Sequence, residues 1–185
     1  MAGLMRVIHK LGFLYRYHVR CGGSVALYLR TLGAQVGHGC MIDTHITNFG
    51  SEPWLIRIGD RVSLARGVCF VTHDGSSRVF RDRFAEMNSM GNKFGTIVIE
   101  ENCFIGMNAI LMPGIVIGGD SIVGAGSVVT RSVPPKSVVA GNPAKPICSL
   151  DAFIERYRSS MLHLAATDRV ALRKELTMKL WGAER

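Results

Sequence analysis

Long hydrophobic runs are missing from this 185-residue sequence. No stretch reaches the roughly 18 uninterrupted apolar residues that a membrane-spanning helix requires. The first 20 residues are partly apolar, but Arg6, Lys10, Arg16 and Arg20 interrupt them, which a secretory signal peptide does not tolerate. We therefore expect a cytoplasmic protein. Its 48% apolar and 19% charged residues are ordinary for a globular domain.

The cysteines lack the spacing of a metal or disulfide framework. There are five, an odd number, and no two of them have CxxC spacing: Cys21, Cys40, Cys69, Cys103 and Cys148. The sequence therefore indicates neither a disulfide scaffold nor a zinc site, and we expect no metal.

Acidic residues are absent from Met1 to Ile42, which holds five Lys and Arg residues, and the whole chain has a net charge of +8. A basic surface of this kind is typical of nucleic-acid binding, but no aromatic stacking run or known binding motif accompanies it. We expect no nucleic-acid partner. An anionic small ligand or an anionic membrane surface accounts for the charge equally well.

A repeat of six residues runs without a break from Ile99 to Pro134. An aliphatic residue occupies the first place of each hexad, glycine recurs at the second, and a small or β-branched residue stands at the fifth. This period matches neither a helix nor an alternating strand, and predicts short strands stacked into three-sided coils. The first-place residues should point inward: Ile99, Ile105, Leu111, Ile117, Val123 and Val129. Gly106, Gly118 and Gly124 should lie at corners that need positive φ or close approach.

The repeat extends upstream to Val36, with two interruptions at 48–57 and at Asp74–Thr96. The second is long for a loop inside a compact domain, and we interpret it as a functional arm. Residues 36–147 thus form the coil. Residues 1–35 contain an amphipathic helical pattern from Leu4 to Tyr15, which packs on the mouth of the coil or lies on a membrane surface.

The pattern changes to a helical period after Ile147, so residues 148–185 are predicted to form a helical tail. Ser149 can cap a first helix and Thr167 a second. Both helices are expected to cover coil ends or neighbouring subunits, and we assign them no chemistry.

Three motifs resemble a known family. The hexads are followed by GAGSVVTR from Gly124 and by VAGNPAKPI from Val139, and a THD tripeptide, Thr72 to Asp74, stands just before the arm. The chain resembles the left-handed β-helix acyltransferases that include galactoside, maltose, serine and xenobiotic acetyltransferases. The segment FGSEPWLI from Phe49 resembles the subgroup that O-acetylates sugars of capsule, O-antigen and related surface polysaccharides. The resemblance implies an all-β solenoid, a left-handed parallel β-helix, that transfers acetyl groups from acetyl-CoA to a sugar hydroxyl.

His73 is the candidate general base. Acetyl transfer to a hydroxyl requires removal of its proton during attack, and imidazole is a free base at working pH. His73 ends a hexad strand directly before the arm, and the family's catalytic histidine occupies the matching place. A carboxylate should hold the second ring nitrogen, and Glu52 and Asp74 are the two candidates. No GxSxG elbow or Cys-His pattern indicates a covalent nucleophile.

Residues for the acetyl-CoA donor are implied by the resemblance alone. Phe104 stands where some relatives have a Trp against the pantetheine arm. Ala125 would offer backbone contacts, Thr130 and Arg131 would lie near the nucleotide, and Lys145 would reach a phosphate. A cation often found just after the GNPAK stretch is replaced here by Cys148.

The resemblance also implies a homotrimer, because the family's donor groove forms between neighbouring subunits. Two other functions remain open. An N-acetyltransferase acting on a nucleotide-linked amino sugar would be favoured by an N-terminal nucleotide-sugar domain, which this sequence does not show. A non-catalytic β-helix used for assembly or binding is the second, and its carbonic-anhydrase-like relatives need three zinc-binding histidines on adjacent coils, a pattern that is absent from the six histidines here.

Overall fold

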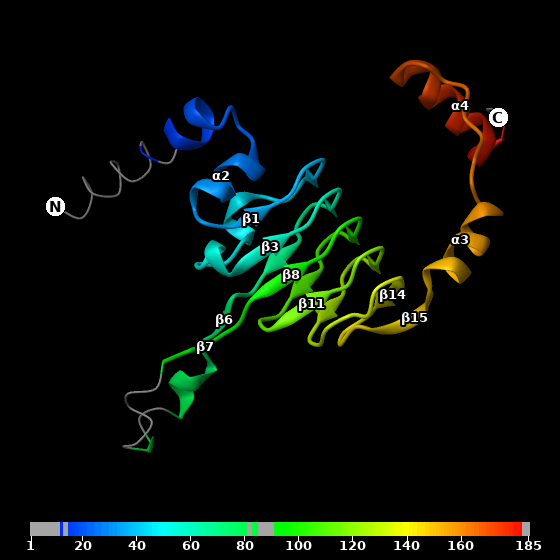
Figure 1. The fold of residues 1–185 in the computed structure, drawn as a ribbon. Coiled ribbons are helices and arrows are strands. Elements are labelled where there is room, and N and C mark those ends of the chain that lie inside the picture. Colours follow the sequence, from blue (N-terminus) through cyan, green and yellow to red (C-terminus); the bar gives the residue numbers. More distant parts are fainter. Residues whose placement is uncertain (1–11, 13–14, 81–82, 85–90, 183–185) are drawn as a thin grey trace. The chain divides into compact units, whose positions relative to one another are not determined.

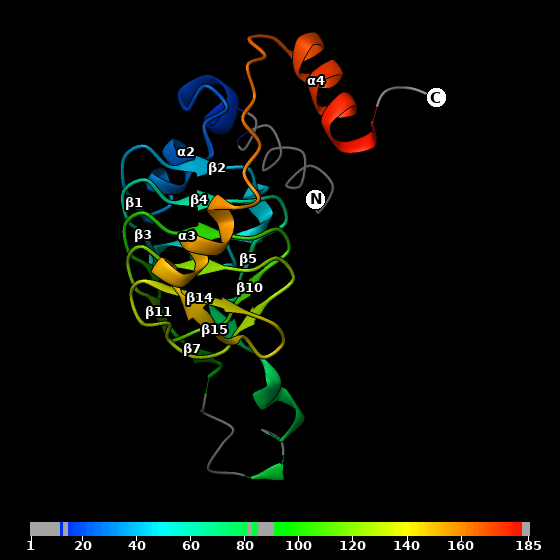
Figure 2. The ribbon, with the colours of Figure 1, turned by 90° about the vertical axis from the view of Figure 1, so that its right-hand side faces the viewer.

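In the computed structural model the hexads form three parallel sheets that the chain visits in turn (Figures 1 and 2). The structure describes residues 12, 15–80, 83–84 and 91–182, which fall into two compact units, 1–151 and 152–185. The predicted helix from Leu4 to Tyr15 lies outside the described residues except for Gly12 and Tyr15. A π-helix, η1, spans Tyr15–Arg20.

Successive coils add strands to the three sheets in turn, although not every coil has a strand in each sheet. The first sheet consists of β1 (Gln35–Val36), β3 (Ile56–Ile58), β8 (Ile97–Ile99) and β11 (Ile115–Ile117). The second consists of β2 (Met41–Ile42), β4 (Ser63–Leu64), β9 (Phe104–Ile105), β12 (Ile122–Val123) and β14 (Ser137–Ala140), with β15 (Lys145–Ser149) at its edge. The third consists of β5 (Cys69–Phe70), β10 (Ile110–Leu111) and β13 (Val128–Val129).

The strand register confirms that three hexads make one coil. Ile97 of β8 pairs with Ile115 of β11, which stands three hexads further along the chain, and β9 pairs with β12 at the same separation. Where the sequence pattern is interrupted, the paired residues stand further apart in the chain. The first interruption lengthens the coil between β1 and its partner β3, where Gln35 pairs with Arg57, and the whole arm is inserted between Ile56 and its partner Ile97. Both interruptions therefore loop out of the coil without disturbing its stacking.

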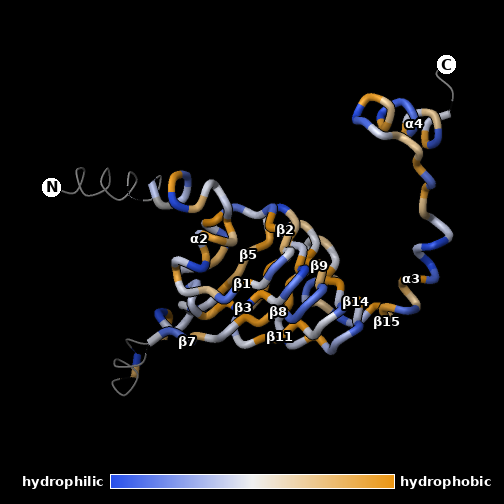
Figure 3. The backbone as a smooth tube through the Cα atoms, turned by 45° about the horizontal axis from the view of Figure 1, so that its top comes forward, coloured by the Kyte–Doolittle hydropathy of each residue, from blue (hydrophilic) through white to orange (hydrophobic). Residues whose placement is uncertain are grey.

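The first-place residues point inward, as predicted. Their exposed fractions are 0–1% for Ile99, Ile105, Leu111, Ile117, Val123 and Val129. Residues at the fifth place are also buried, among them Cys103, Ala109, Ile115, Ser121 and Ser127. Hydrophobic residues therefore recur along each coil (Figure 3). Burial of this continuous stack supplies the main driving force for folding.

The sequence left open whether glycine at the second place of the hexad provides positive φ or the close approach of neighbouring coils. The structure shows that it provides close approach. A Cβ on Gly106 would lie 2.4 Å from the backbone nitrogen of Ala125, and one on Gly118 would lie 2.4 Å from that of Pro135. Positive φ belongs to the fourth place of the hexad, where glycine, asparagine and aspartate predominate. Examples are Asn102, Asn108, Gly114, Asp120 and Gly126.

Short elements complete the first unit. Helix α2 (Val25–Thr31) begins after Ser24, whose hydroxyl accepts the N–H of Leu27, and packs against β1 with Leu29 fully buried. The first interruption contains two 3₁₀ turns, η2 (Ile46–Asn48) and η3 (Pro53–Leu55). The arm leaves the coil as an antiparallel pair of strands, β6 (His73–Asp74) and β7 (Lys93–Phe94), with the 3₁₀ turn η4 (Ser76–Val79) between them (Figure 1).

The tail contains two helices, as predicted. Helix α3 (Leu150–Arg158) follows Ser149 directly, and α4 (Arg169–Trp181) lies within the second unit. The predicted cap at Thr167 is wrong, because Asp168 accepts the N–H groups of Val170 and Ala171.

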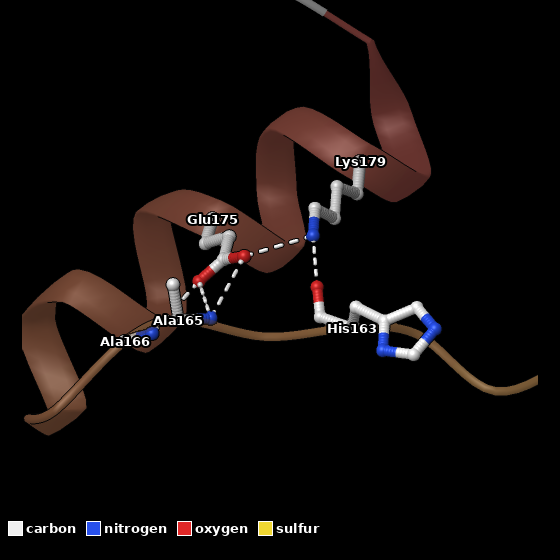
Figure 4. Close-up of polar contacts among 5 residues, drawn as sticks. All are labelled: His163, Ala165, Ala166, Glu175 and Lys179. Carbon is white, nitrogen blue, oxygen red and sulfur yellow. Dashed lines mark hydrogen bonds and ion pairs between the residues drawn. The ribbon is translucent and has the colours of Figure 1, made fainter.

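A carboxylate holds the segment that precedes α4. Glu175 of α4 accepts the N–H groups of Ala165 and Ala166 and pairs with Lys179, which donates to the carbonyl of His163 (Figure 4). These hydrogen bonds hold the pKa of Glu175 below its ordinary value, with the bond from Lys179 as the largest cause. None of the described helices is long and apolar enough to cross a membrane.

Candidate active site

The first interruption is a turn anchored on both sides of Glu52. Phe49 is fully buried and stacks on Phe70, with ring centroids 4.8 Å apart. Pro53, which begins η3, is also buried. Between the two anchors, Gly50 has φ +65° and packs so closely on the coil that a Cβ would lie 2.4 Å from Oγ1 of Thr72. The turn therefore has little freedom to move relative to the end of β5.

Glu52 and His73 meet at the end of this turn, although 21 residues separate them. Nδ1 of His73 lies 2.9 Å from Oε2 of Glu52, and the side chains are 32% and 15% exposed. The hydroxyl of Thr72 donates to the same carboxylate oxygen over 2.5 Å. These bonds, chiefly the one from Thr72, hold the pKa of Glu52 below its ordinary value against the opposing effect of desolvation. The carboxylate is thus anionic at neutral pH and can accept a hydrogen bond from Nδ1–H of His73.

The other ring nitrogen of His73 is available for chemistry. Within the described part of the chain no hydrogen bond engages Nε2. The imidazole stands beside Phe94 of β7, with ring centroids 5.5 Å apart and the planes tilted by 46°. An imidazole held at Nδ1 and open at Nε2 is the arrangement that general-base catalysis requires.

Asp74 holds the arm and makes no hydrogen bond to the imidazole. Its Oδ1 accepts the N–H of Ser76 over 2.8 Å, and in the ladder it stands opposite Lys93. The bond from Ser76 lowers the pKa of Asp74. Of the two carboxylates that the sequence offered, the structure brings Glu52 to the ring nitrogen of His73 and turns Asp74 toward the start of the arm.

Comparisons with known proteins add to this geometry. The family described as the hexapeptide repeat of succinyl-transferase matches residues 96–131. Protein CapG of Staphylococcus aureus is 46% identical over 126 residues, which cover 68% of this chain and 71% of CapG. The chain belongs to the hexapeptide-repeat acetyltransferase family. It is accordingly an acyltransferase, as the sequence predicted.

Two further relatives of this acetyltransferase carry the family activity in their names. A putative acetyltransferase of Schizosaccharomyces pombe is 41% identical over 100 residues, and the chain spans only 44% of its length. The crystal structure of a maltose O-acetyltransferase from Clostridium difficile 630 superposes with a TM-score of 0.51 at 28% identity, covering 66% of this chain and 72% of the other.

The residues predicted to hold the donor fall on different sides of the coil. Phe104 is 47% exposed on the outer face of the second sheet. There it lines a hollow of about 260 Å³ together with Arg61 and Asp120. Ala125 lies at the corner between the second and third sheets, beside Gly124, whose N–H donates to the carbonyl of Val139 in the next coil.

Lys145 lies near the corner of Ala125, and Thr130 and Arg131 lie elsewhere. Lys145 pairs with Ala140, the residue that packs against Gly124. Thr130 and Arg131 are exposed and follow β13, at the corner where His73 also leaves the third sheet. A single chain therefore does not bring the five donor residues together.

Sequence reasoning missed three parts of this acetyltransferase's site. Thr72 was noted only as part of the THD tripeptide, and no role was assigned to Gly50 or Phe94. The glycine in FGSEPWLI was a usable signal for a tight approach, whereas Phe94 carried none.

A second hollow, of about 620 Å³, was also unforeseen. It lies between α2 and the coil and is lined by Tyr17, His45 and Arg66 among others. Among the described residues no group of three His, Cys, Asp or Glu side chains could hold a metal ion.

Proposed function

We propose that this enzyme is an O-acetyltransferase that moves an acetyl group from acetyl-CoA to a sugar hydroxyl in the synthesis of a surface polysaccharide. The observation that carries the proposal is the 2.9 Å contact between Nδ1 of His73 and Glu52 beside an open Nε2. The similarity to a maltose O-acetyltransferase supports a sugar as acceptor, and FGSEPWLI resembles the polysaccharide subgroup.

His73 acts as general base and then as general acid. Glu52 accepts a hydrogen bond from Nδ1–H of His73, so the proton stays on Nδ1 and the lone pair of Nε2 faces the acceptor. Nε2 removes the hydroxyl proton while the acceptor oxygen attacks the thioester carbonyl carbon. When the tetrahedral intermediate collapses, the C–S bond breaks and the imidazolium returns the proton to the CoA thiolate. The products are the acetyl ester and free CoA, and the histidine ends in its initial state.

The donor lies between neighbouring subunits of a homotrimer in this proposal. Phe104, Ala125 and Lys145 lie away from the corner of His73, so two chains together could supply one complete groove. Lys145, Thr130 and Arg131 would contact the nucleotide and phosphates of acetyl-CoA, Phe104 its pantetheine, and Ala125 would offer backbone hydrogen bonds. The coil winds left-handed, as in the rest of the family.

We propose that the reaction takes place in the cytoplasm. The basic segment Met1–Ile42 favours association of the enzyme with the anionic inner face of the membrane. An acceptor linked to a lipid phosphate would reside at that face.

The test is a panel of sugar acceptors, with amino sugars included, incubated with acetyl-CoA while release of free thiol is followed. We expect thiol release with a hydroxyl acceptor. We expect His73→Ala to lower kcat by about 10²–10⁴ while the Kd for acetyl-CoA stays within a few-fold. His163→Ala, in the exposed tail, is the matched control. Wild-type turnover by His73→Ala, or transfer to amines alone, would refute the proposal.

A further inference from the structure

Thr72 has a buried hydroxyl aimed at the site. The residue is 1% exposed, and its Oγ1 lies 2.5 Å from Oε2 of Glu52. A carboxylate only accepts hydrogen bonds, so the threonine hydroxyl must be the donor. The same oxygen accepts a second hydrogen bond, from Nδ1 of His73 at 2.9 Å. Two donors on successive residues thus converge on a single carboxylate oxygen.

The position of Thr72 is set from two directions. Its backbone carbonyl accepts the N–H of Gly95 over 3.1 Å, which closes the base of the arm. On the other side Gly50 packs against the side chain, and its missing Cβ leaves room for the hydroxyl. Contacts other than those to Glu52 and His73 therefore help to position Oγ1 of Thr72.

We infer that Thr72 is a positioning residue, whose hydroxyl holds the Glu52 carboxylate in the orientation and anionic form that keep the proton of His73 on Nδ1. The inference rests on the proposed function of His73 as general base. With the proton on Nδ1, the lone pair of Nε2 faces the acceptor. Without the Thr72 bond, the carboxylate can rotate about its terminal torsion and the ring loses its fixed tautomer.

Charge and burial explain why a second donor is needed. Glu52 is only 15% exposed, and desolvation by burial acts to raise the pKa of its carboxyl group against the hydrogen bonds that lower it. The bond from Thr72 is the largest influence that lowers the pKa of Glu52, and His73 adds to it. In the described part of the arm ladder, the charged residues next to His73 and Phe94 are Asp74 and Lys93, which stand opposite each other.

The test compares Thr72→Val, which keeps the shape and removes the hydroxyl, with Thr72→Ser, which keeps the hydroxyl. Thr44→Val is the matched control, because Thr44 is also a buried threonine, but its hydroxyl donates to the backbone carbonyl of Val68 and accepts from the side chain of Asn48. We expect Thr72→Val to lower kcat about tenfold with an unchanged KM for acetyl-CoA, and Thr72→Ser to stay within about threefold of wild type.

Two spectroscopic measurements on the full chain need no turnover. A ¹³C titration should show the pKa of Glu52 moving up toward its ordinary value in Thr72→Val and unchanged in Thr44→Val. Long-range ¹H–¹⁵N spectra should show His73 losing its Nδ1-protonated tautomer. Thr72→Ala is measured alongside, so that misfolding of the valine variant does not decide the result.

A double-variant cycle separates positioning from structural damage. If Thr72 acts through Glu52, adding Thr72→Val to Glu52→Gln should lower kcat no further. Additive losses, or an unchanged His73 tautomer in Thr72→Val, would overturn the inference. The proposed function fails separately, if His73→Ala retains turnover, because the spectra report the Thr72–Glu52–His73 contacts in either case.

Discussion

Replacing Gly50 by alanine would push the turn that carries Glu52 away from His73. The added Cβ would lie 2.4 Å from Oγ1 of Thr72 and 3.1 Å from the carbonyl oxygen of Phe70, where ordinary van der Waals contact begins at 3.4 Å. The turn or Thr72 must therefore move by about 1 Å. The bonds of 2.5 Å and 2.9 Å to Glu52 would not survive such a shift, because a separation near 3.6 Å is no longer a hydrogen bond.

The loss of stability has two sources. Gly50 has φ +65°, and an L-residue in this left-handed conformation costs about 1–2 kcal/mol. Forcing a methyl group into the contact with Thr72 and Phe70 adds about 1–3 kcal/mol, as for other overpacked sites. We expect Gly50→Ala to lower the free energy of unfolding by about 2–5 kcal/mol and kcat by at least tenfold.

Gly114→Ala is the control that isolates backbone strain. Gly114 also has positive φ, +84°, but a Cβ there meets no atom within 4 Å. Urea denaturation of both variants, together with kcat on a validated acceptor, separates the two effects. Gly114→Ala should lose only about 1–2 kcal/mol of stability and keep its activity. Equal destabilisation of the two variants, or full activity in Gly50→Ala, would refute the reasoning that a close approach at Gly50 positions Glu52.

Three other perturbations test the donor residues, the arm and the charge of Glu52. Lys145→Ala and Arg131→Ala should each raise the KM for acetyl-CoA by about 10-fold or more. The increase should be much smaller with a dephospho analogue if the residue binds the 3′-phosphate, and equal losses with both donors would argue against that contact. Replacing residues 76–93 by a short Gly-Ser link should keep the fold and should keep acetyl-CoA binding, measured by thermal shift. The same change should abolish acetyl transfer to the sugar. Transfer at a rate comparable to wild type would show that the arm does not bind the acceptor. The pKa of Glu52 is lowered from 4.5, so its ionised form should stabilise the folded protein relative to Glu52→Gln. This stabilisation should be full above pH 4.5 and should disappear as the pH falls through the lowered pKa. A difference in urea denaturation that does not change with pH would contradict this.

The coil could be predicted from the sequence because its rule is local. From Ile99 to Val129 every hexad places an aliphatic residue at the first position, and three hexads to a coil set each of them above its counterpart in the next coil. Ile105, Leu111 and Val123 are accordingly fully buried. The family motifs were equally local, and GNPAK and THD led to the acetyltransferase family without any knowledge of contacts.

Local reasoning was weaker at the ends of elements. Thr167 and Asp168 are both good helix caps, and the choice depends on which side chain reaches the free N–H groups of α4. The glycines of the second hexad place were correctly assigned to corners, but only the packing of one coil on the next shows that close approach, and not positive φ, requires them there.

The arrangement around His73 was decided by the tertiary structure. The sequence offered Glu52 and Asp74 as partners for the imidazole, and Asp74 is the nearer in the chain. The first interruption returns to the coil because Phe49 is buried on Phe70, and Gly50 allows it to approach Thr72, so the distant Glu52 reaches Nδ1. The hexad period predicts which residues are buried in the coil. The contacts of a segment that interrupts the period depend on where its own buried residues, here Phe49 and Pro53, pack.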